Sequence, residues 1–210
     1  MNGPLDQGPG RGLKRALDLG ERAFCVLVFV TFVARLSPTL AMKPWDAVIL
    51  VSEGLVVFFV VIRRGALMVS TRPIDWLIAL TGTVAPMLIH AGGRPLAPPA
   101  VALGLMLFGL LFSIWAKLIL RRSFGLVAAN RGVVHTGPYS FVRHPIYAGY
   151  VLVYIGFFLD NPLAWNAGVY LATVSLLIVR VLAEERVLAQ DPAYAAFMGR
   201  VRYRLAPGVF

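Results

Sequence analysis

Long apolar blocks alternate with short polar connections along almost the whole chain. Six apolar segments can be marked, at 23–42, 46–62, 74–91, 97–120, 145–159 and 163–182. A helix needs about 20 predominantly apolar residues to cross the hydrocarbon core of a bilayer, and several of these blocks approach or exceed that length. The pattern therefore predicts an all-α, polytopic membrane helix bundle with about six membrane-crossing segments.

Proline and glycine separate most of these blocks, as expected for turns between helices. The last two blocks are short and are joined by Asp160-Asn161-Pro162, which predicts one tight antiparallel hairpin. The polar stretch 121–143 and the tail after Arg180 fall on the same side of this hairpin, so we expect them to form a cytoplasmic cap over it. The sequence contains no internal repeat and no sign of a second domain, and residues 1–210 are interpreted as a single membrane domain.

Residues 1–20 are rich in Gly, Pro and Arg and predict a flexible cytoplasmic lead-in. A cleavable signal peptide is the alternative, with the apolar run from Phe24 as its core and small residues near Ala41 as its cleavage site. The polar lead is long for a signal peptide, which favours the first interpretation.

Composition supports the membrane interpretation. Hydrophobic residues make up 59% of the chain and charged residues 14%, whereas a soluble domain is about half apolar and one quarter charged. The net charge of +10 could indicate nucleic acid. Because the Lys and Arg lie between apolar blocks, we do not expect nucleic-acid binding. Cys25 is the single cysteine, which excludes an intrachain disulfide.

The distribution of positive charge predicts the orientation in the membrane. If the amino terminus is inside, the 20 Lys and Arg divide into 17 on the inner side and three outside, Arg35, Lys43 and Arg94. Under the positive-inside rule this bias predicts an even number of crossings, with both termini cytoplasmic. The Ala-, Val-, Leu- and Arg-rich composition suggests the inner membrane of a bacterium.

The first candidate site is the predicted start of the fifth span. Arg143, His144 and Tyr147 surround Pro145, and proline suits the first turn of a helix because its missing N–H needs no partner there. A helix amino terminus with an Arg beside it attracts carboxylates and other anions. The alternative is that these residues only anchor the helix at the membrane surface, and the spacing alone leaves both open.

The second candidate site is the carboxyl end of the sixth span. Arg180 and Glu184 are four residues apart and share one helix face, and Glu185 follows. Two adjacent acids in so basic a chain could receive a cationic group such as an α-amine, or form only a surface ion pair. Glu53, inside the second span, is a functional candidate by default. It could equally pair with another helix or an oligomer partner.

Several familiar sites are missing from the sequence. It has no GxxxxGK(S/T) motif, no HExxH motif and no cluster of Cys and His. We therefore expect neither a Walker-type nucleotide site nor a metal site. Acidic residues within the apolar blocks are few, so a proton-coupled transporter is not the leading hypothesis, although Glu53 keeps it open.

The two candidate sites together match a known family pattern. Residues 137–149 read GPYSFVRHPIYAG, and a hydrophobic hairpin and Glu184-Glu185-Arg186 follow. This combination resembles the isoprenylcysteine carboxyl methyltransferase family, part of a wider group that includes the phospholipid N-methyltransferases. The likeness covers roughly residues 115–210, and the first four spans carry no comparable signal.

The resemblance implies S-adenosylmethionine-dependent methyl transfer at the cytoplasmic face. It implies that residues 115–210, and not a Rossmann sheet, form the cofactor-binding half. Glu184 would pair with the methionine ammonium, and Arg180 or the helix start with the methionine carboxylate. The cofactor-binding residues implied by position are Arg131, Gly132, Val133, Val134, Tyr139, His144, Pro145, Ile146, Tyr147, Arg180, Glu184 and Glu185.

The resemblance also implies a lipid-linked or small hydrophobic methyl acceptor and favours a prenylcysteine-like carboxylate. A carboxylate is already nucleophilic, so the protein has mainly to align donor and acceptor. Arg143 and Arg200 are the candidate catalytic residues that would orient it. Near Arg200 the chain departs from the family pattern, so Arg204 is an open alternative to Arg200. An amine or thiol acceptor would have to lose a proton, with His135 or Glu185 as candidate bases.

Two other functions stay open. A membrane sterol- or enone-type reductase that uses NADPH has a related carboxy-terminal motif, but the adjacent Glu184 and Glu185 favour a methyl donor. A non-catalytic scaffold or small transporter would bind no cofactor, and substitution of Arg143 or Glu184 would change only its folding. Besides the acceptor, the expected partners are membrane lipids, and the oligomeric state does not follow from the chain.

Overall fold

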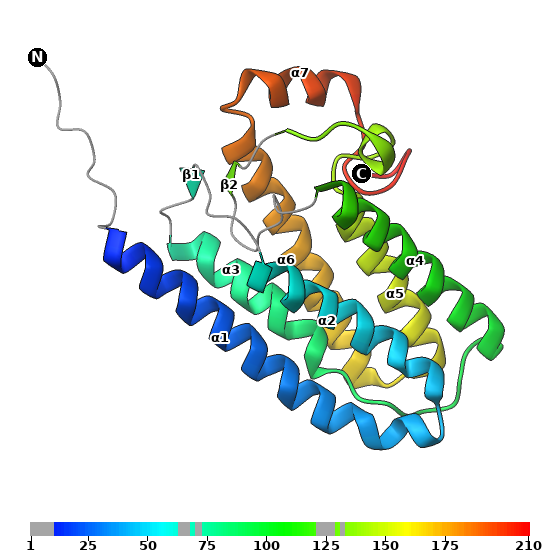
Figure 1. The fold of residues 1–210 in the computed structure, drawn as a ribbon. Coiled ribbons are helices and arrows are strands. Elements are labelled where there is room, and N and C mark those ends of the chain that lie inside the picture. The colour runs from blue at the N-terminus through cyan, green and yellow to red at the C-terminus, as the bar shows by residue number, and fades with distance from the viewer. Residues whose placement is uncertain (1–10, 63–67, 70–72, 121–128, 131–132) are drawn as a thin grey trace, which may run out of the picture.

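The computed structural model describes residues 11–62, 68–69, 73–120, 129–130 and 133–210, which form a helical bundle with a small cap at one end (Figure 1). The helices are α1 (Arg11–Leu36), α2 (Ala47–Ile62), α3 (Pro73–Val84), α4 (Pro99–Leu120), α5 (Pro145–Asp160), α6 (Ala164–Leu188) and α7 (Pro192–Arg200). Short 3-10 turns lie at η1 (Ser37–Ala41), η2 (Pro44–Asp46), η3 (Ala85–Leu88) and η5 (Gly137–Ser140). The strands β1 (Met68–Val69) and β2 (Ala129–Asn130) pair antiparallel beside the carboxyl end of α6.

The predicted all-α membrane bundle is confirmed, because each of the six apolar blocks contains a helix. Within the described residues, four helical segments are long and apolar enough to cross a membrane: Asp18–Ala41, Pro44–Ile62, Pro99–Leu120 and Ala164–Leu188. Two apolar helices are shorter, Leu77–Leu88 and Pro145–Asp160. At 1.5 Å per residue the second rises only about 24 Å, less than the hydrocarbon thickness of about 30 Å. The count of six crossings therefore stays a prediction.

The amino-terminal boundary differs from the one expected from composition. Helix α1 begins at Arg11, so residues 11–20 are helical and do not belong to a flexible lead-in. Good helix formers such as Leu, Lys, Arg and Ala occupy much of this stretch, and they outweigh its glycines. Residues 1–10 lie outside the described residues.

Local sequence explains where several helices start. Helices α3, α4, α5 and α7 each begin at a proline, where the missing N–H costs no hydrogen bond. Asp191 caps α7, since its carboxylate accepts a hydrogen bond from the backbone N–H of Ala193 at 2.9 Å. Only residues 161–163 separate α5 from α6, which confirms the predicted tight hairpin.

Helices α4 and α5 approach each other closely through glycine. A Cβ built on Gly109 of α4 would lie 2.5 Å from the carbonyl oxygen of Gly149, and one built on Gly149 of α5 would lie 2.6 Å from that of Gly109. A Cβ on Gly156 would meet the carbonyl oxygen of Ala102 at 2.7 Å. Small residues permit this backbone-to-backbone packing, which is a common way for helices to associate in membranes. The contact fixes the position of α5 and therefore of the residues at its start.

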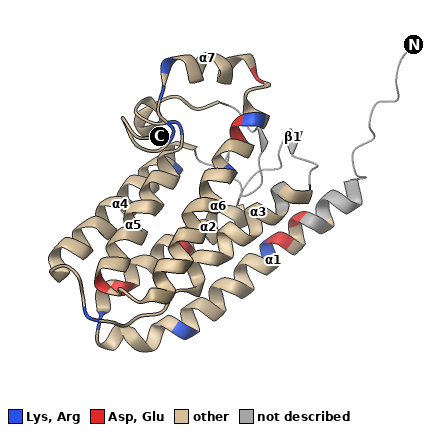
Figure 2. Ribbon diagram, turned by 180° about the vertical axis from the view of Figure 1, so that it is seen from behind, with Lys and Arg blue, Asp and Glu red and all other residues tan. Residues whose placement is uncertain are grey.

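Charged residues gather at the two ends of the bundle (Figure 2). At the end away from α7, Lys43 donates to Asp160 at 2.9 Å and to Asn161 at 3.0 Å, and Arg35 donates to the carbonyl oxygen of Met87. Arg94 lies in the connection that docks here, because the nearby N–H of Leu96 donates to the carbonyl oxygen of Leu159. The three cations assigned to the outer side thus share one end of the fold. Which side of a membrane this end faces stays a prediction.

Candidate functional site

The chain enters α5 through a segment that is tied to the carboxy-terminal tail. Arg143 and His144 donate their backbone N–H groups to the carbonyl oxygens of Tyr203 and Arg204, both at 2.9 Å. Pro145 then begins the helix, with His144 at the N-cap position. This pairing holds the tail over the start of α5 and brings residues about 60 positions apart in sequence into one cluster.

Glu185 of α6 joins three separate parts of this cluster. Its Oε1 lies 3.1 Å from Nε of Arg143 and 3.2 Å from Nε2 of His144. Its Oε2 accepts a hydrogen bond from Nε of Arg204 at 2.9 Å. A buried carboxylate needs such partners, because desolvation of the charge would otherwise be costly. Glu185 therefore links the last helix, the start of α5 and the tail.

Glu184 makes a different set of contacts. The hydroxyl of Tyr147 donates to its Oε1, which also lies 3.2 Å from Nε of Arg180. Its Oε2 is 3.7 Å from Nδ1 of His144. Successive residues of a helix point about 100° apart, so Glu184 faces Tyr147 and Arg180 while Glu185 faces the tail. The imidazole of His144 lies between the two acids.

Aromatic rings complete this part of the cluster. The ring of His144 stacks on that of Tyr147 with centroids 5.8 Å apart, and the guanidinium carbon of Arg180 lies 5.2 Å from the centroid of the Tyr147 ring. An acid and a guanidinium side by side, next to an aromatic face, can bind a ligand that carries both an ammonium and a carboxylate. The Glu184 side chain is 16% exposed and that of Glu185 is 8% exposed, so Glu184 is the more accessible of the two.

Two phenols of the cap lie close to these acids and stay neutral. Burial raises the pKa of Tyr139 far above its usual value, and the nearby Glu184 carboxylate adds to the shift. Burial likewise raises the pKa of Tyr194, with a further contribution from Glu185. Both groups therefore remain hydrogen-bond donors at any physiological pH.

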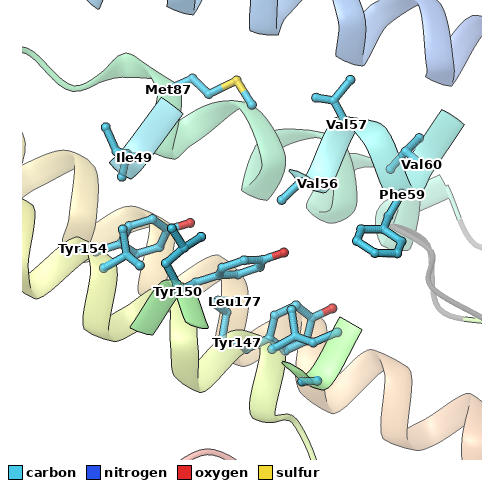
Figure 3. Close-up of a cluster of buried hydrophobic side chains, with 14 of the residues drawn as sticks. Ile49, Val56, Val57, Phe59, Val60, Met87, Tyr147, Tyr150, Tyr154 and Leu177 are labelled. Carbon is cyan, nitrogen blue, oxygen red and sulfur yellow. The ribbon is translucent and has the colours of Figure 1, made fainter. Parts of the chain in front are cut away.

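A pocket opens directly from the cluster into the bundle. The pocket is narrow and partly open. Tyr147 and Arg180 belong to both the cluster and the pocket wall. Figure 3 shows Tyr147, Tyr150 and Tyr154 in a row along α5, with Val56 of α2 opposite them. The other lining residues are Glu53, Gly82, Thr83, Pro86, Thr173 and Leu177.

Most of the residues singled out from the sequence meet in or beside this cluster. Those in direct contact are Arg143, His144, Tyr147, Arg180, Glu184 and Glu185. Tyr139, Pro145 and Ile146 are buried close by, and Val133 and Val134 are half-buried against the hydrophobic core. Arg131 and Gly132 lie outside the described residues. The ligand that these residues bind stays a prediction.

Arg200 and His135 are not brought into the cluster. Arg200 is exposed at the end of α7, and His135 is exposed ahead of η5. Arg204, the alternative to Arg200, is the tail arginine that contacts Glu185. The tail reads Arg200-Val201-Arg202-Tyr203-Arg204, and nothing in this alternation shows which arginine reaches Glu185. The backbone hydrogen bonds from residues 143 and 144 to Tyr203 and Arg204 decide which part of the tail lies over the start of α5.

The fold and the cluster define a polytopic membrane protein whose polar site lies at one end of its carboxy-terminal helical hairpin. Residues 102–190 match the profile of the isoprenylcysteine carboxyl methyltransferase (ICMT) family. The match runs from the first turn of α4 to just past α6, and it confirms the resemblance to that family of membrane methyltransferases. No curated protein matches the chain. The matched segment contains both acids and ends before α7 and the tail.

Proposed function

We propose that this protein is an S-adenosylmethionine-dependent membrane methyltransferase that acts at the cytoplasmic face on a lipid-linked or small hydrophobic acceptor. Glu184 is in contact with Tyr147, Arg180 and His144, and all four residues lie within the segment that matches the family profile. This arrangement is the main support for the proposal. The family match also favours methyl transfer over the NADPH-dependent reductase.

The residues present fit this cofactor. Its methionine part carries an ammonium and a carboxylate, which suit Glu184 and Arg180 respectively. Its positively charged sulfur suits an environment of aromatic faces, and the rings of Tyr147 and His144 provide one. Half-buried Val133 and Val134 offer apolar contact for the adenine ring. When bound, the cofactor supplies an electrophilic methyl group, to which a lone pair of the acceptor forms the new bond while the electrons of the carbon–sulfur bond return to sulfur.

The protein's own contribution is then alignment and electrostatics. Glu185 holds Arg143, His144 and Arg204 together, so that the start of α5 and the tail form one rigid wall. Arg143 would orient a carboxylate acceptor, which needs no general base because it is already an anion. Arg200 could share this role only after a movement of the tail, since it lies exposed at the end of α7. Positioning of this kind accounts for a large part of catalysis in group transfer.

Calorimetric binding of S-adenosylmethionine and of NADPH to detergent-purified protein tests the proposal. Saturable binding of S-adenosylmethionine by the wild-type protein, weakened at least about tenfold in Glu184→Gln, is the expected result, as hydrogen bonds to charged groups have this strength. Arg202→Ala is the matched control, because Arg202 is exposed in the same tail. Absence of binding of both S-adenosylmethionine and its demethylated product would refute the proposal. Binding of NADPH instead would favour the reductase.

A further inference from the structure

An acidic residue lies deep in the bundle at the inner part of the pocket. Glu53 is in the middle of α2, only 2% exposed, and it lines the pocket together with Tyr154. The Tyr154 hydroxyl lies 3.5 Å from its Oε1, a long hydrogen bond. An ionisable side chain inside a membrane-spanning helix is expensive to keep and usually serves a function.

Other buried polar groups beside Glu53 lack hydrogen-bond partners. Within the described part of the chain, no partner satisfies the Tyr150 hydroxyl or Nζ of Lys117, and both residues are buried. The Lys117 ammonium lies 4.7 Å from the centroid of the Tyr150 ring. Tyr150 lines the same pocket as Glu53. A buried hydroxyl without a partner destabilises a fold, so its presence in a pocket wall points to a ligand that supplies the partner.

The pocket has two polar ends and an apolar middle. Arg180 and Tyr147 form the end at the cluster, and Glu53 and Tyr154 form the inner end. Seven residues separate Tyr147 from Tyr154 along α5, which corresponds to about 10 Å along the helix axis. The apolar wall between the ends comes from Val56, Pro86 and Leu177.

We infer that this pocket binds the methyl acceptor and selects an amphiphile with a hydroxyl group between about 5 and 10 Å from its methyl-accepting atom, the range from Tyr150 to Tyr154 along α5. A hydroxyl can donate to the Glu53 carboxylate and accept from the Tyr150 hydroxyl at the same time. A purely hydrocarbon tail would leave the Tyr150 hydroxyl without a partner and Glu53 with only its long hydrogen bond from Tyr154, and a protonated amine could not accept from Tyr150. The inference rests on the proposed function, because it assigns the cluster end of the pocket to methyl transfer.

Matched pairs of eight-carbon probes test this inference. The pairs are octanoate with ω-hydroxyoctanoate, octanethiol with ω-hydroxyoctanethiol, and octylamine with ω-hydroxyoctylamine. Each pair differs by one hydroxyl at the far end of a chain whose length is comparable with the pocket. Binding to wild-type protein is measured by calorimetry and by the shift of the thermal unfolding midpoint, and methylation is followed where it occurs. Neither binding readout depends on turnover.

In at least one pair the hydroxylated probe should bind about tenfold more tightly than its partner. Tyr150→Phe and Glu53→Met should each remove most of this preference, because neither new side chain offers the hydroxyl a strong hydrogen bond, and Tyr150→Phe serves where Glu53→Met fails to fold. Tyr170→Phe is the matched control: it removes another buried hydroxyl without a partner, but one that does not line the pocket, so the preference should be unchanged.

The outcomes separate this inference from the proposed function. If S-adenosylmethionine does not bind, both fall. If it binds, but hydroxylated and plain probes bind equally in every pair, the acceptor inference alone is overturned. A preference that persists in both Tyr150→Phe and Glu53→Met also overturns it.

Discussion

Replacement of Gly109 by alanine tests the packing of α4 on α5 most directly. The added Cβ would lie 2.5 Å from the carbonyl oxygen of Gly149 and 2.9 Å from the backbone nitrogen of Val153. Ordinary van der Waals contact begins at 3.4 Å, so the two helices must separate by about 0.9 Å locally. Both opposing atoms belong to backbone and cannot rotate away, so the helices themselves must move.

The expected cost follows from this overlap. Insertion of a methyl group into a well-packed core typically destabilises a protein by about 1–3 kcal/mol. A shift of α5 also moves His144 and Tyr147, which lie at its start. Displacement of site residues by about 1 Å can reduce activity on the order of a hundredfold. Gly109→Ala should therefore lower both stability and activity, although Gly109 lies on a different helix from these residues.

Gly104→Ala is the control on the same helix, because a Cβ at Gly104 meets nothing within 4 Å. It should leave stability unchanged or raise it by up to about 1 kcal/mol, since alanine is the better helix former. Equilibrium unfolding of both variants in mixed detergent micelles, followed by tryptophan fluorescence, measures the difference. Equal stability of Gly109→Ala and Gly104→Ala would refute the close approach of α4 and α5.

Three further predictions concern the cap and the opposite end of the bundle. Arg204→Ala should release the tail from Glu185, so that the tail is cleaved faster in limited proteolysis, whereas Arg202→Ala should not change the rate. Equal cleavage of the two variants would contradict the pairing of Arg204 with Glu185. Burial raises the pKa of Tyr194 in the folded protein, so as pH rises the Tyr194 hydroxyl loses its proton in the unfolded chain before it does in the folded one. The free energy of unfolding should therefore fall above about pH 10. Tyr194→Phe should flatten that alkaline loss in a pH series of unfolding measurements, and an unchanged slope would count against it. Lys43→Met leaves the buried Asp160 carboxylate without its cation and should destabilise the protein by roughly 3 kcal/mol in the same unfolding titration. An unchanged stability would show that this ion pair contributes little.

The sequence by itself determined the helical elements and pointed to most of the residues that form the polar cluster. Apolar blocks of membrane length, separated by Pro and Gly, are local signals, and each of them became a helix. The hairpin, the proline at the start of α5 and the spacing of Arg180 and Glu184 could also be predicted, since each depends on neighbours within a few residues. The start of α1 was the least accurate boundary, because the first turns of a helix are marked only weakly by composition.

Only the tertiary structure decided which distant residues meet. Helices α4 and α5 approach each other closely at Gly109 and Gly149, whereas a Cβ at Gly104 would meet nothing. Nothing in the sequence distinguishes the two glycines at the contact from Gly104. Arg204 contacts Glu185 and Arg200 does not, because backbone hydrogen bonds between the tail and residues 143 and 144 set the register. Glu53 was visible as a charge inside a span, but its place in one pocket with the α5 tyrosines depends on how α2 packs. Such contacts join residues far apart in the chain, and their energies depend on packing geometry that no local pattern encodes.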